Sequence, residues 1–165
     1  MQKVLYSGGQ KSGKSKLAEV KALELAKENK PYYIATYNNS VRDVEMTLRI
    51  DAHKEQRKDS FHTIEELLNL DNIIKDGETY LVDCISMWIF NNLDNEPNNL
   101  LEQLEYIANK NANIVFVLNE VGTGIIPSDQ MSRKFVDLTG MLGQKLASFC
   151  DEVYDVKLGI GIKIK

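Results

Sequence analysis

Near its start the chain reads Gly8-Gly9-Gln10-Lys11-Ser12-Gly13-Lys14-Ser15, which matches the pattern G-x-x-x-x-G-K-[ST] at every fixed position. An apolar run, Val4–Ser7, precedes this stretch, and an amphipathic helical pattern, Lys14–Asn29, follows it. Glycines let the backbone wrap closely around a phosphate chain, and successive N–H groups then converge on the anion at the positive end of the helix. The stretch therefore predicts a phosphate-binding loop between a strand and a helix.

Two side chains of this loop, and one acid further along, have predicted roles with a nucleoside triphosphate and Mg²⁺. Lys14 should reach the β and γ phosphates, and the Ser15 hydroxyl should ligate the metal. Asp83 follows an apolar run, which is the form of a Walker-B acid that holds the metal or its water shell. The alternative for Asp83 is an acid that only caps the next helix. The predicted nucleotide-binding residues of the loop are Gly8, Gly9, Gln10, Lys11, Ser12, Gly13, Lys14 and Ser15, and the predicted metal ligands are Ser15 and Asp83.

The remaining chain alternates short apolar runs with longer helical patterns, and this alternation predicts an α/β fold. Strands separated by helices imply βαβ units, and hence a mostly parallel sheet with helices on both faces. The close spacing of the last two runs predicts a C-terminal hairpin. Strands are expected at Tyr32–Thr36, Phe61–Thr63, Thr79–Cys84, Ile114–Leu118, Val153–Lys157 and Ile160–Lys165, and helices at Val41–Glu55, Ile64–Leu70, Ile85–Leu93, Leu100–Asn109 and Ser128–Phe149, with Ser128 as a helix cap.

The composition is that of one ordinary globular domain, which we expect to span residues 1–165. With 165 residues, 43% hydrophobic and 27% charged, the chain can bury a core without a disulfide or a structural metal. Its net charge of −4 provides no basic excess to drive binding to a nucleic-acid backbone. No run of about 20 apolar residues suggests a membrane span. Cys84 and Cys150 lack metal-binding spacing and are expected to be buried thiols in a cytoplasmic protein.

His53 is the histidine with the stronger case for a chemical role. Arg49 and His53 are four residues apart in a helical pattern, so they share one helical face. An imidazole beside a guanidinium group suits attack on a phosphate, because the cation offsets the developing charge. The alternative is an exposed histidine on a charged surface helix. His62 has weaker support.

Five segments, in order, are similar to those of one enzyme family. They are Ser7–Ser15, Tyr33–Thr36, Glu45–His53, Asn119–Pro127 and Gly159–Lys163. On them the chain resembles the adenosylcobinamide kinase/adenosylcobinamide-phosphate guanylyltransferase family of cobalamin biosynthesis, the CobU/CobP type. The likeness runs from residue 5 to residue 165. Many families share a phosphate loop, whereas the histidine block and the Asn119–Pro127 loop together are much more specific.

The resemblance implies two reactions and a set of functional residues. One reaction phosphorylates adenosylcobinamide with a nucleoside triphosphate, ATP or GTP, and the other transfers GMP from GTP to adenosylcobinamide phosphate. The position that matches the family's guanylylated histidine is His53. The resemblance also implies a RecA-like P-loop fold and a homo-oligomer, commonly a trimer. We expect Tyr80, Trp88 and Phe90 to lie in the core rather than under the corrinoid. The implied guanine-nucleotide contacts are Ala35, Thr36, Arg57, Glu65 and Asp83.

Two other functions are compatible with a phosphate loop. The first is an ordinary small-molecule P-loop kinase that forms no covalent histidine adduct. The second is a nucleotide-dependent switch or assembly module, which needs a recognition element such as the N-K-x-D motif of switch GTPases. The segment Asn119-Glu120-Val121-Gly122 is not that motif, so the switch ranks last. The loop Asn119–Pro127 contains two glycines and is either a lid close to the ligand or a tight connector.

Overall fold

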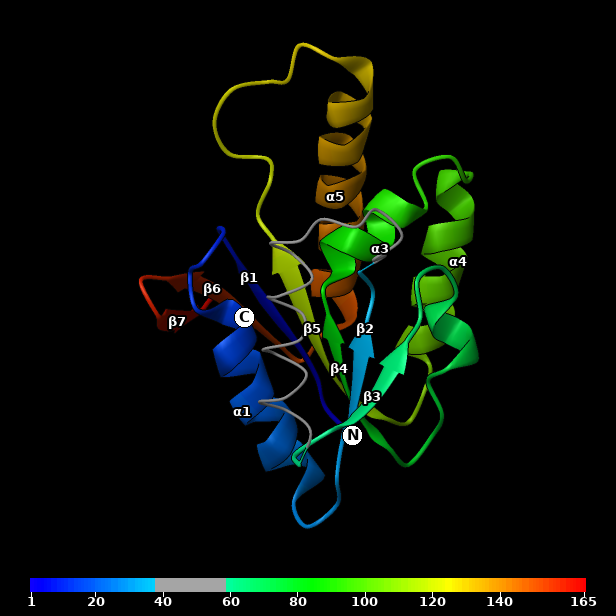
Figure 1. The fold of residues 1–165 in the computed structure, drawn as a ribbon, viewed down its shortest axis with the longest axis vertical. Coiled ribbons are helices and arrows are strands. Elements are labelled where there is room, and N and C mark those ends of the chain that lie inside the picture. The colour runs from blue at the N-terminus through cyan, green and yellow to red at the C-terminus, as the bar shows by residue number, and fades with distance from the viewer. Residues whose placement is uncertain (38–58) are drawn as a thin grey trace.

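The computed structural model describes residues 1–37 and 59–165, which form a seven-stranded sheet with flanking helices (Figure 1). The strand order is β3-β2-β4-β5-β1-β6-β7, and every neighbouring pair is parallel except β6 with β7. The predicted α/β class and mostly parallel sheet are confirmed, whereas the helix predicted at Val41–Glu55 lies outside the described residues. In chain order the elements are β1 (Lys3–Gly8), α1 (Lys14–Ala26), β2 (Tyr32–Ala35), β3 (His62–Glu65), the 3-10 helix η1 (Leu70–Asn72), β4 (Thr79–Asp83), α3 (Ile85–Asn91), α4 (Pro97–Ala108), β5 (Asn113–Asn119), α5 (Gln130–Phe149), β6 (Glu152–Lys157) and β7 (Ile160–Lys163).

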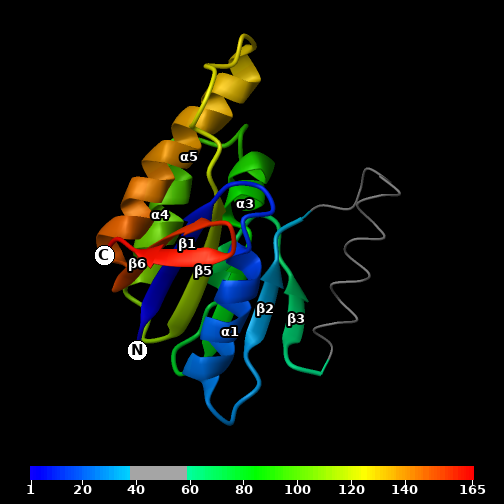
Figure 2. The same cartoon turned by 90° about the vertical axis from the view of Figure 1, so that its left-hand side faces the viewer.

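Helices cover both faces of the sheet, as the side view shows (Figure 2). Side chains alternate between the faces along a strand. Val4 and Tyr6 of β1 therefore pack with α1, whereas Leu5 packs with the helices of the opposite face, α3, α4 and α5. Each face thus has its own buried cluster, and the sheet lies between two layers of helix.

The α1 helix buries a narrower face than its apolar pattern suggests. Ala18, Ala22 and Ala26, spaced by four residues, are buried against the sheet, whereas Val20 is 59% exposed and Leu23 is 38% exposed. Small side chains let the helix approach the sheet closely, so the larger residues lie on its outer sides. The helix also ends at Ala26 rather than at Asn29, because the next residue, Lys27, has a positive φ of 57°, which a right-handed helix cannot continue through.

The prediction of a helix at Ile64–Leu70 is wrong. Ile64 and Glu65 belong to β3, and only the 3-10 turn η1 follows. The cause is a local side-chain competitor for the backbone. The Glu66 carboxylate accepts hydrogen bonds from the N–H groups of Leu68 at 2.9 Å and Asn69 at 2.8 Å, which holds the segment in a loop.

The two later helices on the second face begin at different residues from those predicted. Asp129, not Ser128, caps α5, and its carboxylate accepts a hydrogen bond from the Ser132 N–H at 2.8 Å. Helix α4 begins at Pro97 rather than Leu100, because proline suits the first helical position, where no N–H is needed.

The interior contains most of the aromatic side chains expected there. Tyr80 and Trp88 are buried, with 2% and 0% exposure, as predicted. Phe90 is not, since 43% of it is exposed near the end of α3. Within the described part of the chain, no helix has the length and apolar character needed to cross a lipid bilayer.

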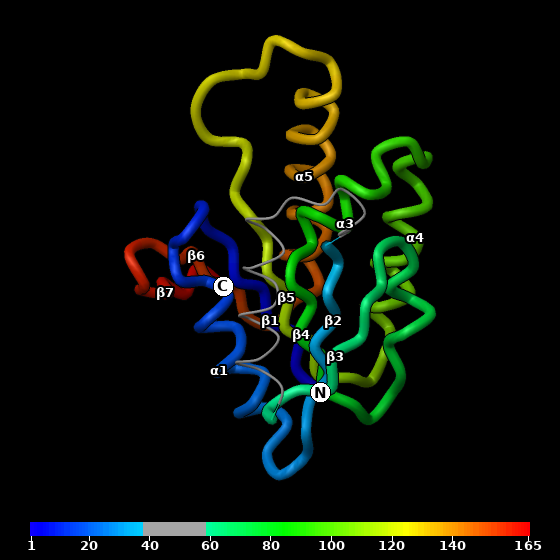
Figure 3. The backbone as a smooth tube through the Cα atoms, viewed as in Figure 1, coloured from blue at the N-terminus to red at the C-terminus, as the bar shows by residue number. Residues whose placement is uncertain are grey.

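The predicted C-terminal hairpin is confirmed. Strands β6 and β7 pair antiparallel, and Lys157 lies opposite Ile160. The two turn residues, Leu158 and Gly159, have φ of 54° and 81°, the left-handed conformation that tight hairpins require. The hairpin lies beside β1 and the start of α1 (Figure 3), so the end of the chain borders the phosphate loop.

Candidate functional site

The predicted phosphate loop connects β1, which ends at Gly8, to α1, which begins at Lys14. Glycine is required at two of its positions for different reasons. Gly13 has φ of 97°, and a Cβ there would lie 3.0 Å from the Gly159 Cα. A Cβ at Gly8 would lie 2.5 Å from the Val156 carbonyl oxygen. The loop is therefore packed directly against the C-terminal hairpin, and its shape depends on the missing side chains.

Lys14 is held within the loop rather than extended into solvent. Only 6% of the residue is exposed, and its ammonium donates a hydrogen bond to the Gly9 carbonyl at 3.1 Å. Burial lowers the pKa of Lys14, and the nearby charge of Asp83 offsets part of that shift. A cation with reduced hydration, placed at a helix N-terminus, is suited to a polyphosphate.

Asp83 lies at the end of β4, and β5 separates β4 from the phosphate-loop strand β1. The Tyr33 hydroxyl of β2 donates a hydrogen bond to Asp83 Oδ2 at 3.2 Å. The acid is thereby oriented at the same sheet edge as Lys14, whose pKa it affects.

Three predicted nucleotide contacts lie in one row across adjacent strands. The parallel register pairs Ala35 of β2 with Asp83 of β4 on one side and with Glu65 of β3 on the other. All three positions are at the carboxyl ends of their strands, where ligands bind in such sheets. The structure therefore brings together residues that are up to 48 positions apart in the sequence.

Thr36 follows Ala35, but its hydroxyl is used within the protein. The residue is fully buried, and its Oγ1 donates to the Cys84 carbonyl at 2.7 Å and accepts from the Cys84 N–H at 3.0 Å. Its own carbonyl accepts a hydrogen bond from the Asn91 amide at 2.8 Å. Thr36 thus fixes the backbone just after Asp83, a positioning role that the sequence pattern did not indicate.

The residues at the end of β5 contact both the segment that follows Asp83 and the phosphate loop. The Asn119 N–H donates to Ser86 Oγ at 2.8 Å, and the Asn119 side-chain amide donates to Cys84 Sγ at 3.6 Å. The next residue, Glu120, donates its N–H to the Gly8 carbonyl at 3.0 Å. The start of the Asn119–Pro127 loop therefore connects the Asp83 strand end to the phosphate loop.

The two cysteines differ in their surroundings. Burial raises the pKa of the Cys150 thiol to about 12, in agreement with the prediction of a buried thiol. Cys84 is only partly covered, and burial together with the Asp83 charge raises its pKa as well. Both groups are therefore neutral thiols near pH 7.

Sequence reasoning missed Tyr33 and Gly159 as parts of this site. Tyr33 belongs to a segment that we singled out, but its hydroxyl partner is 50 residues away. Gly159 begins the last of the segments that resemble the family, but no local pattern indicates that its N–H donates to the Ser12 carbonyl at 2.8 Å. Two predicted residues, His53 and Arg57, lie outside the described residues, as does Arg49, so their roles stay predictions.

Comparisons with known proteins agree on one family. A family model described as cobinamide kinase / cobinamide phosphate guanyltransferase matches residues 4–164. The chain is 34% identical to the bifunctional adenosylcobalamin biosynthesis protein CobU of Escherichia coli (strain K12), over 98% of this chain and 99% of that protein. It is 35% identical to the bifunctional adenosylcobalamin biosynthesis protein CobP of Pseudomonas aeruginosa, over 98% of this chain and 96% of that protein.

A solved structure is also similar in shape. The KaiC-like protein PH0186 of Pyrococcus horikoshii OT3 superimposes with a TM-score of 0.48 and 15% sequence identity, and the match covers 93% of this chain and 70% of that protein.

Proposed function

Because the chain belongs to the cobinamide kinase / cobinamide phosphate guanyltransferase family, it is a bifunctional enzyme of cobalamin biosynthesis, and we propose that both of its reactions use the sheet edge that contains the phosphate loop. The observation that carries this proposal is the convergence of Lys14, Asp83 and the Asn119 segment at that edge. In the kinase reaction the hydroxyl of adenosylcobinamide attacks the γ-phosphorus of ATP or GTP, the bond to the β-phosphate oxygen breaks, and the hydroxyl proton passes to solvent.

The phosphate loop supplies the charge stabilisation for this transfer. Its backbone N–H groups and the Lys14 ammonium bind the β and γ phosphates, where negative charge shifts toward the leaving oxygen. Gly13 and Gly8 keep the backbone of the loop packed against the C-terminal hairpin. The remaining loop residues, Gly9, Gln10, Lys11, Ser12 and Ser15, complete the nucleotide contacts.

Ser15 and Asp83 fit an Mg²⁺ ion that accompanies the nucleotide. Both offer hard oxygen donors, and they come from the start of α1 and the end of β4. The described residues contain no cluster of three or more potential ligands for a metal, so a bound ion would take most of its ligands from phosphates and water. When bound, Mg²⁺ would neutralise charge on the phosphates.

The guanylyltransferase reaction proceeds through His53 in our proposal. A neutral imidazole nitrogen attacks the α-phosphorus of GTP, pyrophosphate leaves, and the imidazole N–H proton passes to solvent. The phosphate oxygen of adenosylcobinamide phosphate then attacks the same phosphorus, the P–N bond breaks, and the leaving imidazole regains a proton from solvent, which gives adenosylcobinamide-GDP and neutral His53. Covalent catalysis of this kind divides one difficult transfer into two displacements.

The guanine nucleotide is held by the row of strand ends and by Arg57 in this proposal. Register places Ala35, Glu65 and Asp83 side by side, which supports a common binding edge. A carboxylate such as that of Glu65 can accept hydrogen bonds from the N–H groups of guanine. Thr36 contributes by fixing the backbone beside Asp83.

We also propose that the enzyme is a cytoplasmic homo-oligomer, in the form of a trimer. The support is the edge strand β7, where Ile160 is 65% exposed, Ile162 is 54% exposed and the following Ile164 is 66% exposed. A row of exposed isoleucines on an edge strand favours pairing with another chain.

The covalent intermediate can be tested with GTP labelled at the α-phosphate. The wild-type chain should become labelled through an acid-labile, base-stable bond, and His53→Ala should reduce labelling to background. The matched control is His62→Ala, which removes the other histidine, on strand β3, and should leave labelling intact. Labelling that survives His53→Ala overturns the proposed nucleophile. A wild-type chain that phosphorylates adenosylcobinamide but never becomes labelled points instead to a P-loop kinase mechanism without a covalent histidine.

A further inference from the structure

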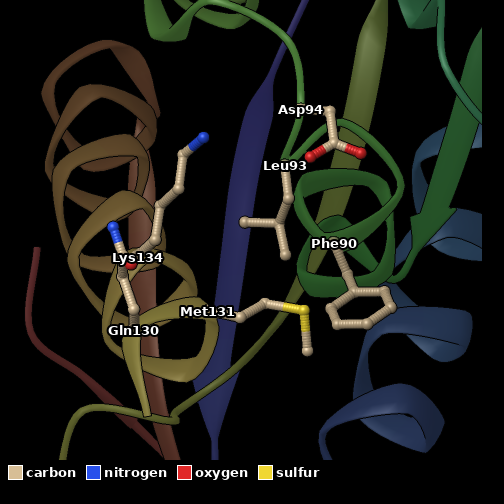
Figure 4. A pocket seen from close by; sticks show the side chains of 6 residues that line it. All are labelled: Phe90, Leu93, Asp94, Gln130, Met131 and Lys134. Carbon is tan, nitrogen blue, oxygen red and sulfur yellow. The ribbon is translucent and has the colours of Figure 1, made fainter.

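A hollow of about 530 Å³ lies between the end of α3 and the start of α5 (Figure 4). We call it the α3–α5 hollow. Its volume is in the range of small-molecule sites. Its lining residues are Phe90, Leu93, Asp94, Gln130, Met131 and Lys134.

The inner part of the α3–α5 hollow is apolar and accessible. Phe90 and Met131 face each other across it in Figure 4, and they are 43% and 59% exposed. The ring of Phe90 is held edge-on by Phe135, with centroids 5.7 Å apart and planes at 90°. A fixed aromatic ring with an open face is unfavourable in water, so it indicates a surface that something apolar covers.

The rim of the hollow is polar and contains both donors and acceptors. Lys134 and Asp94 extend toward its upper edge in Figure 4, and Gln130 lies at its side. An ammonium, a carboxylate and a primary amide can together pair with amide groups, which have one donor and one acceptor side. The hollow therefore combines an apolar floor with partners for amide-bearing arms.

The position of the hollow links it to the phosphate site. Helix α3 begins at Ile85, two residues after Asp83, and rises from the sheet edge where the phosphate loop lies (Figure 1). The loop that leads from Asn119 to α5 borders the same edge, and its Ile125 and Ile126 are 97% and 81% exposed. Exposed apolar groups are thus found both in the hollow and in the loop that joins β5 to α5.

We propose that the α3–α5 hollow binds one edge of the corrin ring of adenosylcobinamide. This inference rests on the proposed function, which requires a large ring with apolar faces and amide arms to bind beside the phosphate site. Phe90 and Met131 contact the apolar ring and its methyl groups, and Asp94, Gln130 and Lys134 pair with the amide arms. The reacting hydroxyl, on a flexible arm of the ring, then extends toward the phosphate loop.

The test is a binding titration on the full chain with cobinamide as the probe. The chain has a single tryptophan, Trp88, which is buried in α3, and a bound corrinoid absorbs in the region of its emission. Quenching of Trp88 fluorescence therefore reports binding in the wild type. Phe90→Ser and Met131→Ser should each weaken cobinamide binding at least tenfold and raise KM for adenosylcobinamide in the kinase assay by a similar factor.

The matched control is Met141→Ser, which removes an exposed methionine of the same helix outside the hollow and should leave the titration unchanged. Histidine labelling by GTP needs no corrinoid, so it serves as the check that each variant is folded. Unchanged cobinamide binding in both hollow variants overturns the proposal. A loss of cobinamide binding that is explained entirely by a change in oligomeric state, as measured by sedimentation velocity, also overturns it. A wild-type chain that neither binds nor phosphorylates cobinamide overturns the proposed function itself.

Discussion

The N–H of Gly159 donates a hydrogen bond to the carbonyl of Ser12 at 2.8 Å, which ties the last hairpin of the chain to the phosphate loop. The backbones of the loop and the hairpin are also closely packed at this point, because a Cβ at Gly13 would lie only 3.0 Å from the Gly159 Cα. The shape of the loop therefore depends on residues at opposite ends of the sequence.

Replacing Gly13 by alanine should weaken nucleotide binding about tenfold or more. The new side chain would have to adopt φ of 97° and would press on the Gly159 backbone, and a strained residue of this kind costs about 1–3 kcal/mol. Titration with a fluorescent GTP analogue measures the change. Gly140→Ala is the control, since a Cβ there meets nothing within 4 Å. That variant should bind normally and gain up to about 1 kcal/mol of unfolding free energy from helix propensity. Equal affinity in Gly13→Ala and wild type would contradict the strain argument.

Replacing Thr36 by valine should lower the free energy of unfolding by about 1–3 kcal/mol. The substitution leaves the N–H and carbonyl of Cys84 without their hydroxyl partner in a buried place. Urea denaturation measures the loss. Thr36→Ser keeps the hydroxyl and should recover most of the hydrogen-bond contribution. Because the Cys84 backbone follows Asp83, Thr36→Val should also lower kcat, and a loss of stability without any change in kcat would limit Thr36 to a purely structural role.

The parts of the fold that follow local patterns could be predicted from the sequence. The phosphate loop is defined by consecutive glycines, a lysine and a serine, so its place between β1 and α1 required no knowledge of the rest of the chain. The hairpin was predictable for the same reason. By contrast, the buried face of α1 consists of alanines, and only close packing on the sheet explains why Val20 is left outside.

The supporting contacts of the site could not be predicted, because their partners are distant in sequence. Tyr33 and Asp83 are 50 positions apart, and Gly159 and Ser12 are further apart still. A local pattern contains no information about which strand ends meet at one edge. The exposure of Phe90 was also unpredictable, since α3 is short and strongly apolar, and its end extends beyond the buried cluster that contains Trp88.

Stability should fall as the pH rises from about 9 toward 12. Burial raises the pKa of Cys150 from 9.0 to about 12, so in this window the folded thiol keeps its proton while the unfolded thiol loses it. The folded state then binds more protons than the unfolded state, and the slope reaches about −1.4 kcal/mol per pH unit for one such group. The pKa of Tyr6 is raised in the same direction, to about 12, mainly by burial.

Urea denaturation at pH 8 and pH 10.5 measures this slope. Cys150→Ala removes the thiol contribution, so the free energy of unfolding of this variant should depend less steeply on pH. At every pH the variant should be less stable than the wild type, because the substitution leaves a small cavity. If the free energy of unfolding falls in parallel with pH in the wild type and in Cys150→Ala, groups other than Cys150 cause the loss of stability at alkaline pH.

Replacing Ile162 by glutamate should convert the proposed trimer into monomers. Ile162 lies on the edge strand β7, is 54% exposed, and is flanked on the same strand by Ile160. A carboxylate buried between two copies would lack a partner, and the cost of its desolvation opposes assembly. Sedimentation velocity on the full chain gives the oligomeric state. Tyr106→Glu is the matched control, because that side chain is 49% exposed on α4 and away from the hairpin. The control should remain trimeric, whereas a wild-type monomer, or a trimer that survives Ile162→Glu, excludes β7 as the interface.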